Sequence, residues 1–258
     1  PSHKEYASSL VKQPLFNVAT EDRQAVLRSL KMEHPCTPLQ TLFLNLSEAF
    51  RAERAAGYVL SRHQPEVSLN RLNARVTELV QEYVRSGHSD WQSYLEFNPH
   101  HYVRHLVDEN EDFEMMLLCW QPGQASHVHN HAESHCWLTC MQGAATEMLY
   151  KPAPASVESS IEPKSQEDRD PPGIVGIAYP CPALELVDEH RLNAGQTGYI
   201  NDSMALHAVG IPADVPAPGS VTLHIYSPPI RRVKLFEPDS NRIVTRKPGF
   251  WSVRGVRQ

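Results

Sequence analysis

The sequence predicts a mainly β fold in which a β-barrel or sandwich follows N-terminal helices. Before Pro99 apolar residues recur with helical spacing, whereas after it they fall into short runs rich in alternating, β-branched and aromatic residues. The chain has 258 residues, of which 41% are hydrophobic and 21% charged, so it can bury one sizeable core. We therefore expect a single domain over residues 1–258, with a helical segment at 20–98, a barrel at 99–236 and a C-terminal tail at 237–258.

Two helices are predicted in the helical segment. The first begins with Thr37 as N-cap and proline in the first helical position, and its apolar face comprises Leu39, Leu42, Phe43 and Leu46. The second follows Ser68 and stops at Gly87, with an apolar face of Leu72, Val76, Leu79, Val80 and Tyr83. We also expect Asp90 to cap a short turn, DWQSYLEF, and a weaker helix at 20–32.

Eight short segments after Pro99 read as strands, and turn residues separate them: YVRHLV, FEMMLLCW, SHVHNH, CWLTCMQG, TEMLY, TGYIND, HAVGI and SVTLHIY. Residues 151–173, KPAPASVESSIEPKSQEDRDPPG, are rich in proline, serine and charge, so we expect a mobile, exposed loop. The C-terminal tail is basic. We expect it to be solvated, with wrapping around the barrel as the alternative.

Charge and cysteine content exclude several classes of protein. A formal net charge of −6 gives no electrostatic reason to bind a phosphate backbone, so no nucleic-acid partner is expected. No apolar run is long enough to cross a membrane, and PSHKEYASSL lacks a secretory core. Five cysteines without a CxxC pair fit neither a disulfide framework nor a zinc ribbon. We expect a cytoplasmic monomer without a membrane partner, in which most thiols are free.

Histidines occupy alternate positions in the segment SHVHNH. On a strand successive side chains point to opposite faces, so all three imidazoles would share one face: His127, His129 and His131. Neighbouring imidazoles can bind one metal ion. Spacing alone fits surface or hydrogen-bonded histidines as well, so the interpretation depends on other residues.

The glycines and histidines of segment 123–143 have the order and spacing of the first motif of the cupin superfamily. Cys136 stands where cupins usually carry glutamate. The second motif normally supplies a histidine on a facing strand, and His207 in YINDSMALHAVG is the natural candidate. This resemblance implies a cupin-type β-barrel with a metal site.

Three neutral imidazoles without a carboxylate leave the charge of a divalent metal uncompensated and coordination positions open. Such a site suits an anionic, chelating substrate. Structural zinc sites are usually closed and four-coordinate with cysteine ligands, so iron with oxygen chemistry is favoured over structural zinc. Copper, nickel and manganese are left open.

The segments VHNHAESHCW, INDSMALHAV and TLHIYSPP together closely resemble the cysteine dioxygenases, the iron-dependent thiol dioxygenases of the cupin superfamily. The likeness runs from about Thr37 to Phe236. It implies one Fe(II) per chain, with three ligands: His129, His131 and His207. It also implies a thioether cross-link between Cys136 and Tyr226, which would form a protein-derived cofactor. Finally, it implies that Arg104, with Tyr102 beside it, binds the substrate carboxylate.

Within TLHIY the residues at alternate positions share one face, which aligns a hydroxyl, an imidazole and a phenol as a hydrogen-bond chain: Thr222, His224 and Tyr226. We therefore expect His224 and Tyr226 to act in catalysis. The resemblance implies a cis peptide at Pro228. We expect His127 and His135 to support the metal site through hydrogen bonds.

The resemblance implies oxidation of L-cysteine with O2 to cysteine sulfinic acid, the first step of cysteine catabolism toward taurine and sulfate. Another thiol dioxygenase, acting on 3-mercaptopropionate or on N-terminal cysteines of proteins, is the nearest alternative. The arginine match favours L-cysteine. A metal-binding cupin without turnover and a redox sensor at Cys136 are further alternatives. The length of loop 151–173, and Arg231-Arg232 after SPPI, depart from the family pattern and bear on access and substrate preference.

Overall fold

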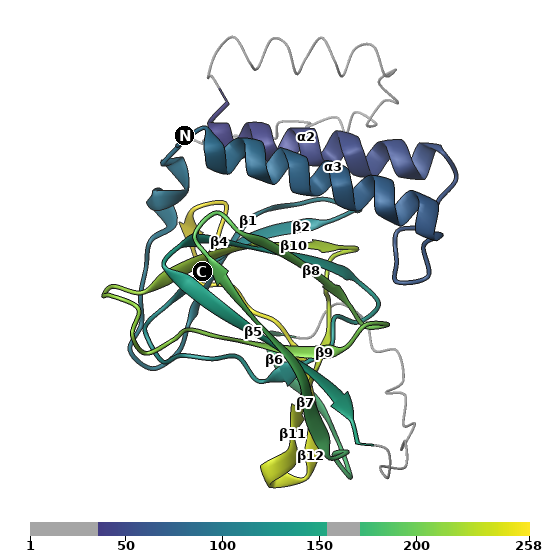
Figure 1. Ribbon diagram of the computed structural model, residues 1–258, viewed down its shortest axis with the longest axis vertical. Helices are drawn as coiled ribbons and strands as arrows, with labels where there is room; N and C mark the ends of the chain where they lie inside the picture. The colour runs from purple at the N-terminus through teal and green to yellow at the C-terminus, as the bar shows by residue number, and fades with distance from the viewer. Residues whose placement is uncertain (1–35, 154–170) are drawn as a thin grey trace, which may run out of the picture. The chain divides into compact units, whose positions relative to one another are not determined.

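The computed structural model describes residues 36–153 and 171–258 (Figure 1). The helix expected at 20–32 and nearly all of the loop expected at 151–173 lie outside these residues. The elements described below belong to one compact unit, Pro38–Gln258. No helix within the described ranges is long and apolar enough to span a membrane.

Helix α2, Pro38–Ala55, begins where the sequence predicted. The Leu39 N–H of its first turn donates to the Asp90 carboxylate at 2.7 Å, and the Tyr83 hydroxyl donates to the other oxygen of that carboxylate at 2.7 Å. The prediction that Asp90 caps its own short turn is therefore wrong. Asp90 returns to α2 because unpaired N–H groups and the positive end of the dipole meet there, whereas its own 3-10 turn, Asp90–Tyr94, has no side-chain cap.

Helix α3, Glu66–Arg85, begins three residues earlier than predicted. Pro65 has extended backbone angles and ends the preceding segment, so the helix follows it directly. Ser68 is not a cap. It lies inside the helix, where its hydroxyl donates to Glu53 of α2 at 2.5 Å. Arg71 also contacts Glu53 with two donors, at 2.6 and 2.7 Å, so the two helices are joined by a partly buried polar cluster.

The strands form two seven-stranded sheets, with orders β14-β13-β1-β2-β10-β4-β8 (sheet A) and β6-β12-β11-β3-β9-β5-β7 (sheet B). Their bounds are β1 Val103–Glu109, β2 Glu114–Trp120, β3 Val128–His129, β4 His135–Gln142, β5 Ala144–Pro152, β6 Gly173–Ala178, β7 Leu184–Asn193, β8 Thr197–Asn201, β9 Leu206–Gly210, β10 Ser220–Ser227, β11 Val233–Glu237, β12 Arg242–Lys247, β13 Ser252–Val253 and β14 Val256–Arg257. The predicted mainly β, cupin-type barrel preceded by helices is confirmed.

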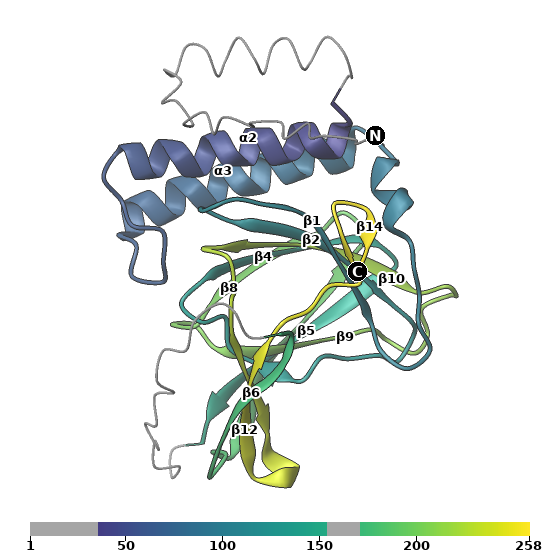
Figure 2. The ribbon, with the colours of Figure 1, turned by 180° about the vertical axis from the view of Figure 1, so that it is seen from behind.

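The helices cover one face of sheet A, over β1, β2, β4 and β10 (Figures 1 and 2). Side chains alternate across these strands, so Trp137 of β4 packs with Phe50 of α2, whereas Leu138 faces the barrel interior. Full burial of a side chain of this size contributes roughly 1.5–3 kcal/mol. Sheet A thus has one face against the helices and one face available for a site.

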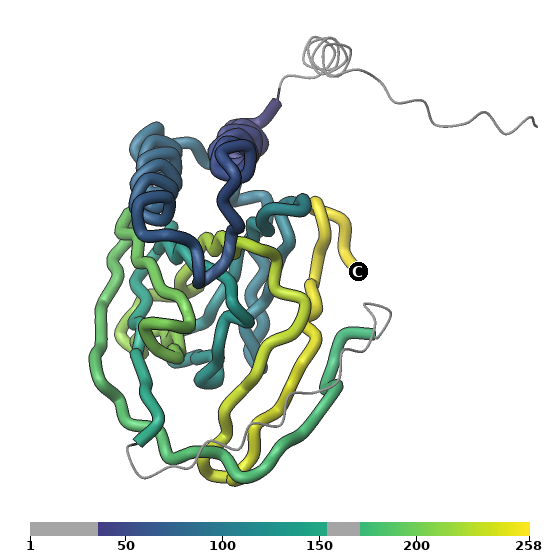
Figure 3. Tube along the Cα trace, turned by 90° about the vertical axis from the view of Figure 1, so that its right-hand side faces the viewer, coloured from purple at the N-terminus to yellow at the C-terminus, as the bar shows by residue number. Residues whose placement is uncertain are grey.

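The C-terminal tail is not solvated as expected. Strand β12 pairs with both β11 and β6, and β13 runs parallel to β1 (Figure 3). The barrel therefore continues well past Phe236, and the alternative of wrapping is the correct one. Strands β6 and β7 were not predicted either. Most β7 side chains are exposed on both faces, so the strand lacks the alternation that marks a half-buried strand.

Candidate metal centre

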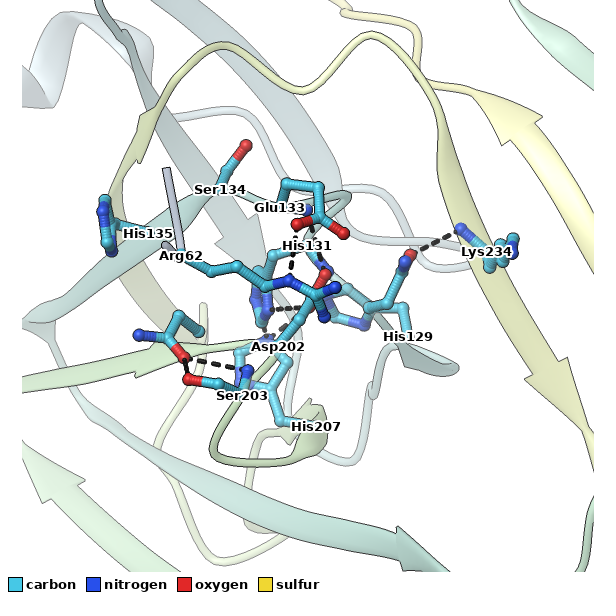
Figure 4. Close-up of polar contacts among 12 residues, drawn as sticks. Arg62, His129, His131, Glu133, Ser134, His135, Asp202, Ser203, His207 and Lys234 are labelled. Atoms are coloured by element: carbon cyan, nitrogen blue, oxygen red, sulfur yellow. Dashed lines mark hydrogen bonds and ion pairs between the residues drawn. The ribbon is translucent and has the colours of Figure 1, made fainter. Parts of the chain in front are cut away.

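Three histidines converge at one point inside the barrel (Figure 4). His129 ends β3 and lies directly opposite His207 of β9, while His131 follows two residues later in a turn. The Nε2 atom of His207 lies 3.0 Å from that of His131 and 3.2 Å from that of His129. All three ligand atoms lie within 4.8 Å of one another. The structure thus brings together the residues that the sequence predicted as ligands.

The outer nitrogen of each ring faces a hydrogen-bond acceptor. His129 Nδ1 lies 2.9 Å from the carbonyl oxygen of His127, and His207 Nδ1 lies 2.7 Å from Glu147 Oε1. His131 Nδ1 lies 3.4 Å from Asp202 Oδ1, too long for a good hydrogen bond. Protons on Nδ1 leave the Nε2 lone pairs directed at the common centre.

Burial disfavours the charged form of two of these rings. It lowers the pKa of His129 to about 3 and that of His207 well below its ordinary value. With the protons on Nδ1, the three Nε2 lone pairs face one another at short range, an arrangement that a bound cation would relieve. No cysteine or carboxylate joins the cluster among the described residues. The donor set therefore fits a divalent metal with open coordination positions.

A hydrogen-bond chain along β10 lies beside the histidines. Thr222 Oγ1 lies 2.9 Å from His224 Nε2, and His224 Nδ1 lies 3.1 Å from the Tyr226 hydroxyl, which confirms the predicted alignment. The sequence did not reveal that Trp120 Nε1 donates to Thr222 at 2.8 Å. Thr222 accepts from Trp120 and can donate its own proton to His224 Nε2. In that tautomer His224 Nδ1–H donates to the phenol oxygen. The phenol proton is then available for a ligand.

Cys136 of β4 lies directly opposite Tyr226 of β10, and both are buried. Side chains in such a pair point to the same face at close range. Burial raises the pKa of the Cys136 thiol and of the Tyr226 phenol, although the phenol beside the thiol lowers the thiol pKa in part. Both groups are therefore protonated near neutral pH. The Tyr226 ring centroid lies 6.0 Å from that of His131, so the pair borders the metal centre.

Arg104 of β1 brings a positive charge close to this centre. Its guanidinium donates to the Met116 sulfur at 3.3 Å and lies 5.4 Å from the Phe250 ring centroid, but its buried Nε has no partner. Sulfur is a weak acceptor, so the guanidinium can still take a strong anionic partner. Tyr102 stacks on Trp120, with ring centroids 4.1 Å apart.

Neither of the two predicted supporting residues contacts a ligand histidine through its own ring. Strand β3 ends at His129, so the three alternating histidines do not share a strand face. The His127 side chain is exposed, and only its carbonyl group contacts the site. His135 is buried but bonds to Tyr199 and Gln64. Because Cys136 faces the barrel interior, its neighbour His135 faces the helices instead.

Asp202 is a site residue that sequence reasoning missed. Its Oδ1 accepts the N–H of His131 at 2.5 Å, and its Oδ2 accepts the N–H of Glu133 at 3.0 Å. A carboxylate directly after strand β8, five residues before His207, is the available signal. The cis peptide implied at Ser227–Pro228 is confirmed. Arg231 pairs with Glu109 at 2.7 Å.

Comparison with known proteins agrees with this geometry. Residues 67–239 match the family model described as cysteine dioxygenase type I. The chain is 30% identical to cysteine dioxygenase type 1 of Danio rerio over 82% of this chain and 92% of that protein. It is 32% identical to the Homo sapiens protein of the same name over 72% of this chain and 80% of that protein.

A solved structure of a conserved protein with a double-stranded beta-helix domain from Klebsiella pneumoniae covers 59% of this chain and 93% of its own, at 14% identity and a TM-score of 0.38. That likeness is too low to add to the family match. The fold and the histidine cluster are those of a cupin-type barrel with a candidate metal site. The chain belongs to the cysteine dioxygenase type I family, which makes it an oxidoreductase of the dioxygenase class.

Proposed function

We propose that the protein oxidises L-cysteine with O2 to cysteine sulfinic acid, using Fe(II) held by His129, His131 and His207. The convergence of three imidazoles, two of them fully buried, beside a guanidinium with an unpartnered Nε is the observation that carries this proposal. The family match supports it. The product would enter the degradation of cysteine toward taurine and sulfate.

Bound iron would supply the redox chemistry for O2 and would favour the thiolate form of the substrate, whose free thiol has a pKa near ~8.5. The protein supplies the nitrogen atoms that would bind the metal. Glu147 and the His127 carbonyl keep the protons of His207 and His129 on Nδ1, so that Nε2 lone pairs face the metal.

Arg104 is proposed to bind the substrate carboxylate. A planar guanidinium can form two parallel hydrogen bonds with a carboxylate, and this fixes which end of the substrate faces the metal. This role separates free cysteine from a protein N-terminal cysteine, which lacks that carboxylate. Contrary to the expectation from the sequence, Arg104 does not separate L-cysteine from 3-mercaptopropionate, because both carry a carboxylate and the two differ by the amine. Tyr102, held on Trp120, is proposed to border the same position.

Tyr226 is proposed to donate its phenol proton to the bound substrate or oxygen. His224 would hold the phenol oxygen through Nδ1–H, and the Thr222 and Trp120 contacts would fix that tautomer. A thioether between Cys136 and Tyr226 would make the phenol more rigid. Its formation would remove one hydrogen from each residue, a two-electron oxidation for which O2, the proposed co-substrate, would be the oxidant. The direct cross-strand pairing supports this cross-link.

Oxygen uptake by anaerobically iron-loaded protein tests the proposal, with L-cysteine and 3-mercaptopropionate supplied in parallel and products identified by mass. Cysteine sulfinic acid formed in proportion to oxygen consumed is the expected result. Uptake with 3-mercaptopropionate alone would move the enzyme to the other substrate. Stoichiometric zinc without uptake on either thiol would contradict the proposal and leave a metal-binding cupin.

A further inference from the structure

The turn that carries His131 has an unfavourable backbone. Ala132 and Glu133 both adopt positive φ angles, of 50° and 74°, in the left-handed region that non-glycine residues rarely occupy. Two such residues in succession persist only where surrounding contacts hold them. Those contacts therefore help to decide where the His131 ring lies.

Two groups hold this turn from opposite sides. The Asp202 carboxylate accepts the N–H groups of His131 and Glu133, at 2.5 and 3.0 Å. From the helical side, the Arg62 N–H donates to the Glu133 carbonyl at 2.8 Å, and the Arg62 guanidinium pairs with the Glu133 carboxylate at 2.5 Å. Figure 4 shows Arg62, Glu133 and Asp202 close together around His131. Arg62 belongs to the segment 61–64, which connects α2 with α3.

The His135 ring is linked by hydrogen bonds to the neighbours of both Arg62 and Asp202. His135 Nε2 bonds to Gln64 Oε1 at 3.2 Å, and the Ser61 backbone also contacts the His135 ring. On its other side, His135 Nδ1 lies 2.7 Å from the Tyr199 hydroxyl, which accepts from Asn201 Nδ2 at 2.8 Å. Asn201 directly precedes Asp202. Every hydrogen bond in this series has a donor and an acceptor when Nε2 of His135 carries the proton and Nδ1 accepts from Tyr199.

We propose that His135 is a positioning residue for the metal centre: through Gln64 and the segment 61–64 on one side, and through Tyr199 and Asn201 on the other, it sets the backbone of the turn that presents His131. In this arrangement, contacts from the helical segment help to set the geometry of the metal site. His135 is completely buried and touches none of the three histidine ligands, so its effect is transmitted through the turn. The inference rests on the proposed function only in that these histidines bind a metal.

The network extends into the helices. Gln64 Nε2 donates to Ser68 Oγ at 2.7 Å, and Ser68 donates to Glu53. The amide of Gln64 is thereby oriented with its oxygen toward His135. A continuous line of buried polar contacts runs from the α2–α3 pair to the Asp202 loop, and buried groups of this kind are costly to leave unpaired.

Cobalt(II) titration of the apo-protein, followed by visible absorbance, tests the proposal without turnover. His135→Phe keeps the ring but removes both hydrogen bonds, and should weaken Co²⁺ binding on the order of 10-fold with a changed ligand-field spectrum, because loss of outer partners of metal ligands typically costs ~10–100-fold. Gln64→Met removes one contact at similar volume and should act in the same direction. This second variant decides the matter if His135→Phe does not fold.

Thr139→Val is the matched control. Thr139 lies on the same face of β4 and bonds to Thr197 of β8 at 2.8 Å, so the variant removes a buried contact between the same two strands without reaching the turn. It should leave Co²⁺ affinity and spectrum unchanged. Unchanged affinity in folded His135→Phe or Gln64→Met, or an equal loss in Thr139→Val, would overturn the proposal. Absence of Co²⁺ binding by the unmodified chain would overturn the proposed function as well.

Discussion

His207 and His131 point at the same centre but are held in opposite ways. His207 lies in strand β9, where ladder hydrogen bonds on both sides and one carboxylate, Glu147, fix the ring. His131 lies in a turn with left-handed residues, which Asp202 and Arg62 hold from outside. One ligand is positioned by regular structure and the other by long-range contacts, so substitutions around them should have different consequences.

The largest effect should come from removing either ligand. His131→Ala and His207→Ala should each weaken Fe(II) binding by at least ~100-fold, beyond the ~10–100-fold typical of losing an outer partner. Isothermal titration under anaerobic conditions measures this loss. If one variant binds iron as well as the unmodified protein, the centre has only two of the three ligands and the comparison fails.

The next largest difference should be between the two carboxylates that hold these ligands, Asp202 for the His131 turn and Glu147 for the His207 ring. Asp202→Asn can accept only one of the two backbone N–H groups, so we expect iron affinity to fall about 10-fold. Glu147→Gln keeps an oxygen for the His207 Nδ1–H and should lower affinity by less than ~3-fold. Both variants remove one negative charge, which makes them a matched pair. Equal affinities in the two would mean that the turn needs no outside support.

Glu114 should make the stability of the protein depend on pH. This buried strand residue lies opposite Tyr226 and accepts the Ile230 N–H at 3.0 Å, and burial raises its pKa to about 7 from an ordinary value of 4.5. A raised folded-state pKa contributes stability that is complete below pH 4.5 and is lost as pH rises through 7. Glu114→Gln stays neutral, so its unfolding free energy should gain on the order of 3 kcal/mol relative to the unmodified protein between pH 4.5 and 8.

Urea unfolding at a series of pH values measures this difference. The glutamine oxygen can still accept the Ile230 N–H, so the two proteins should be similar at low pH. A pH-independent difference between them would show that Glu114 has an ordinary pKa in the fold.

The smallest effects on stability should come from substitutions to glycine. Ala132→Gly relieves a left-handed φ of 50° and should stabilise the protein by roughly 0.5–1 kcal/mol. Ala208→Gly, in the regular strand beside His207, should destabilise it by about 1 kcal/mol. Thermal unfolding of both variants checks the opposite signs. Destabilisation by Ala132→Gly would mean that the turn is not strained.

Features encoded in a short window were predictable. The chain Thr222, His224 and Tyr226 follows from the two-residue period of one strand, and the helix start at Pro38 from its local signals. What failed depends on partners far along the chain. Asp90 caps α2 from 51 residues away, and His135 bonds to Gln64 across 71 residues. No local pattern carries that information, so the helical side of the site and the strands of the tail were missed.

The ring of Phe250 over Arg104 has a consequence for the making of the protein. Arg104 lies on the first strand of the barrel, but one wall of its surroundings comes from a residue next to β13, which pairs in parallel with that strand. Ribosomes add roughly 5–20 residues per second, so about 150 residues separate the arginine from its aromatic neighbour by roughly 7–30 s. During that interval a growing chain carries the guanidinium without its aromatic neighbour, and the surroundings of Arg104 are completed only after the segment around Phe250 has left the ribosome.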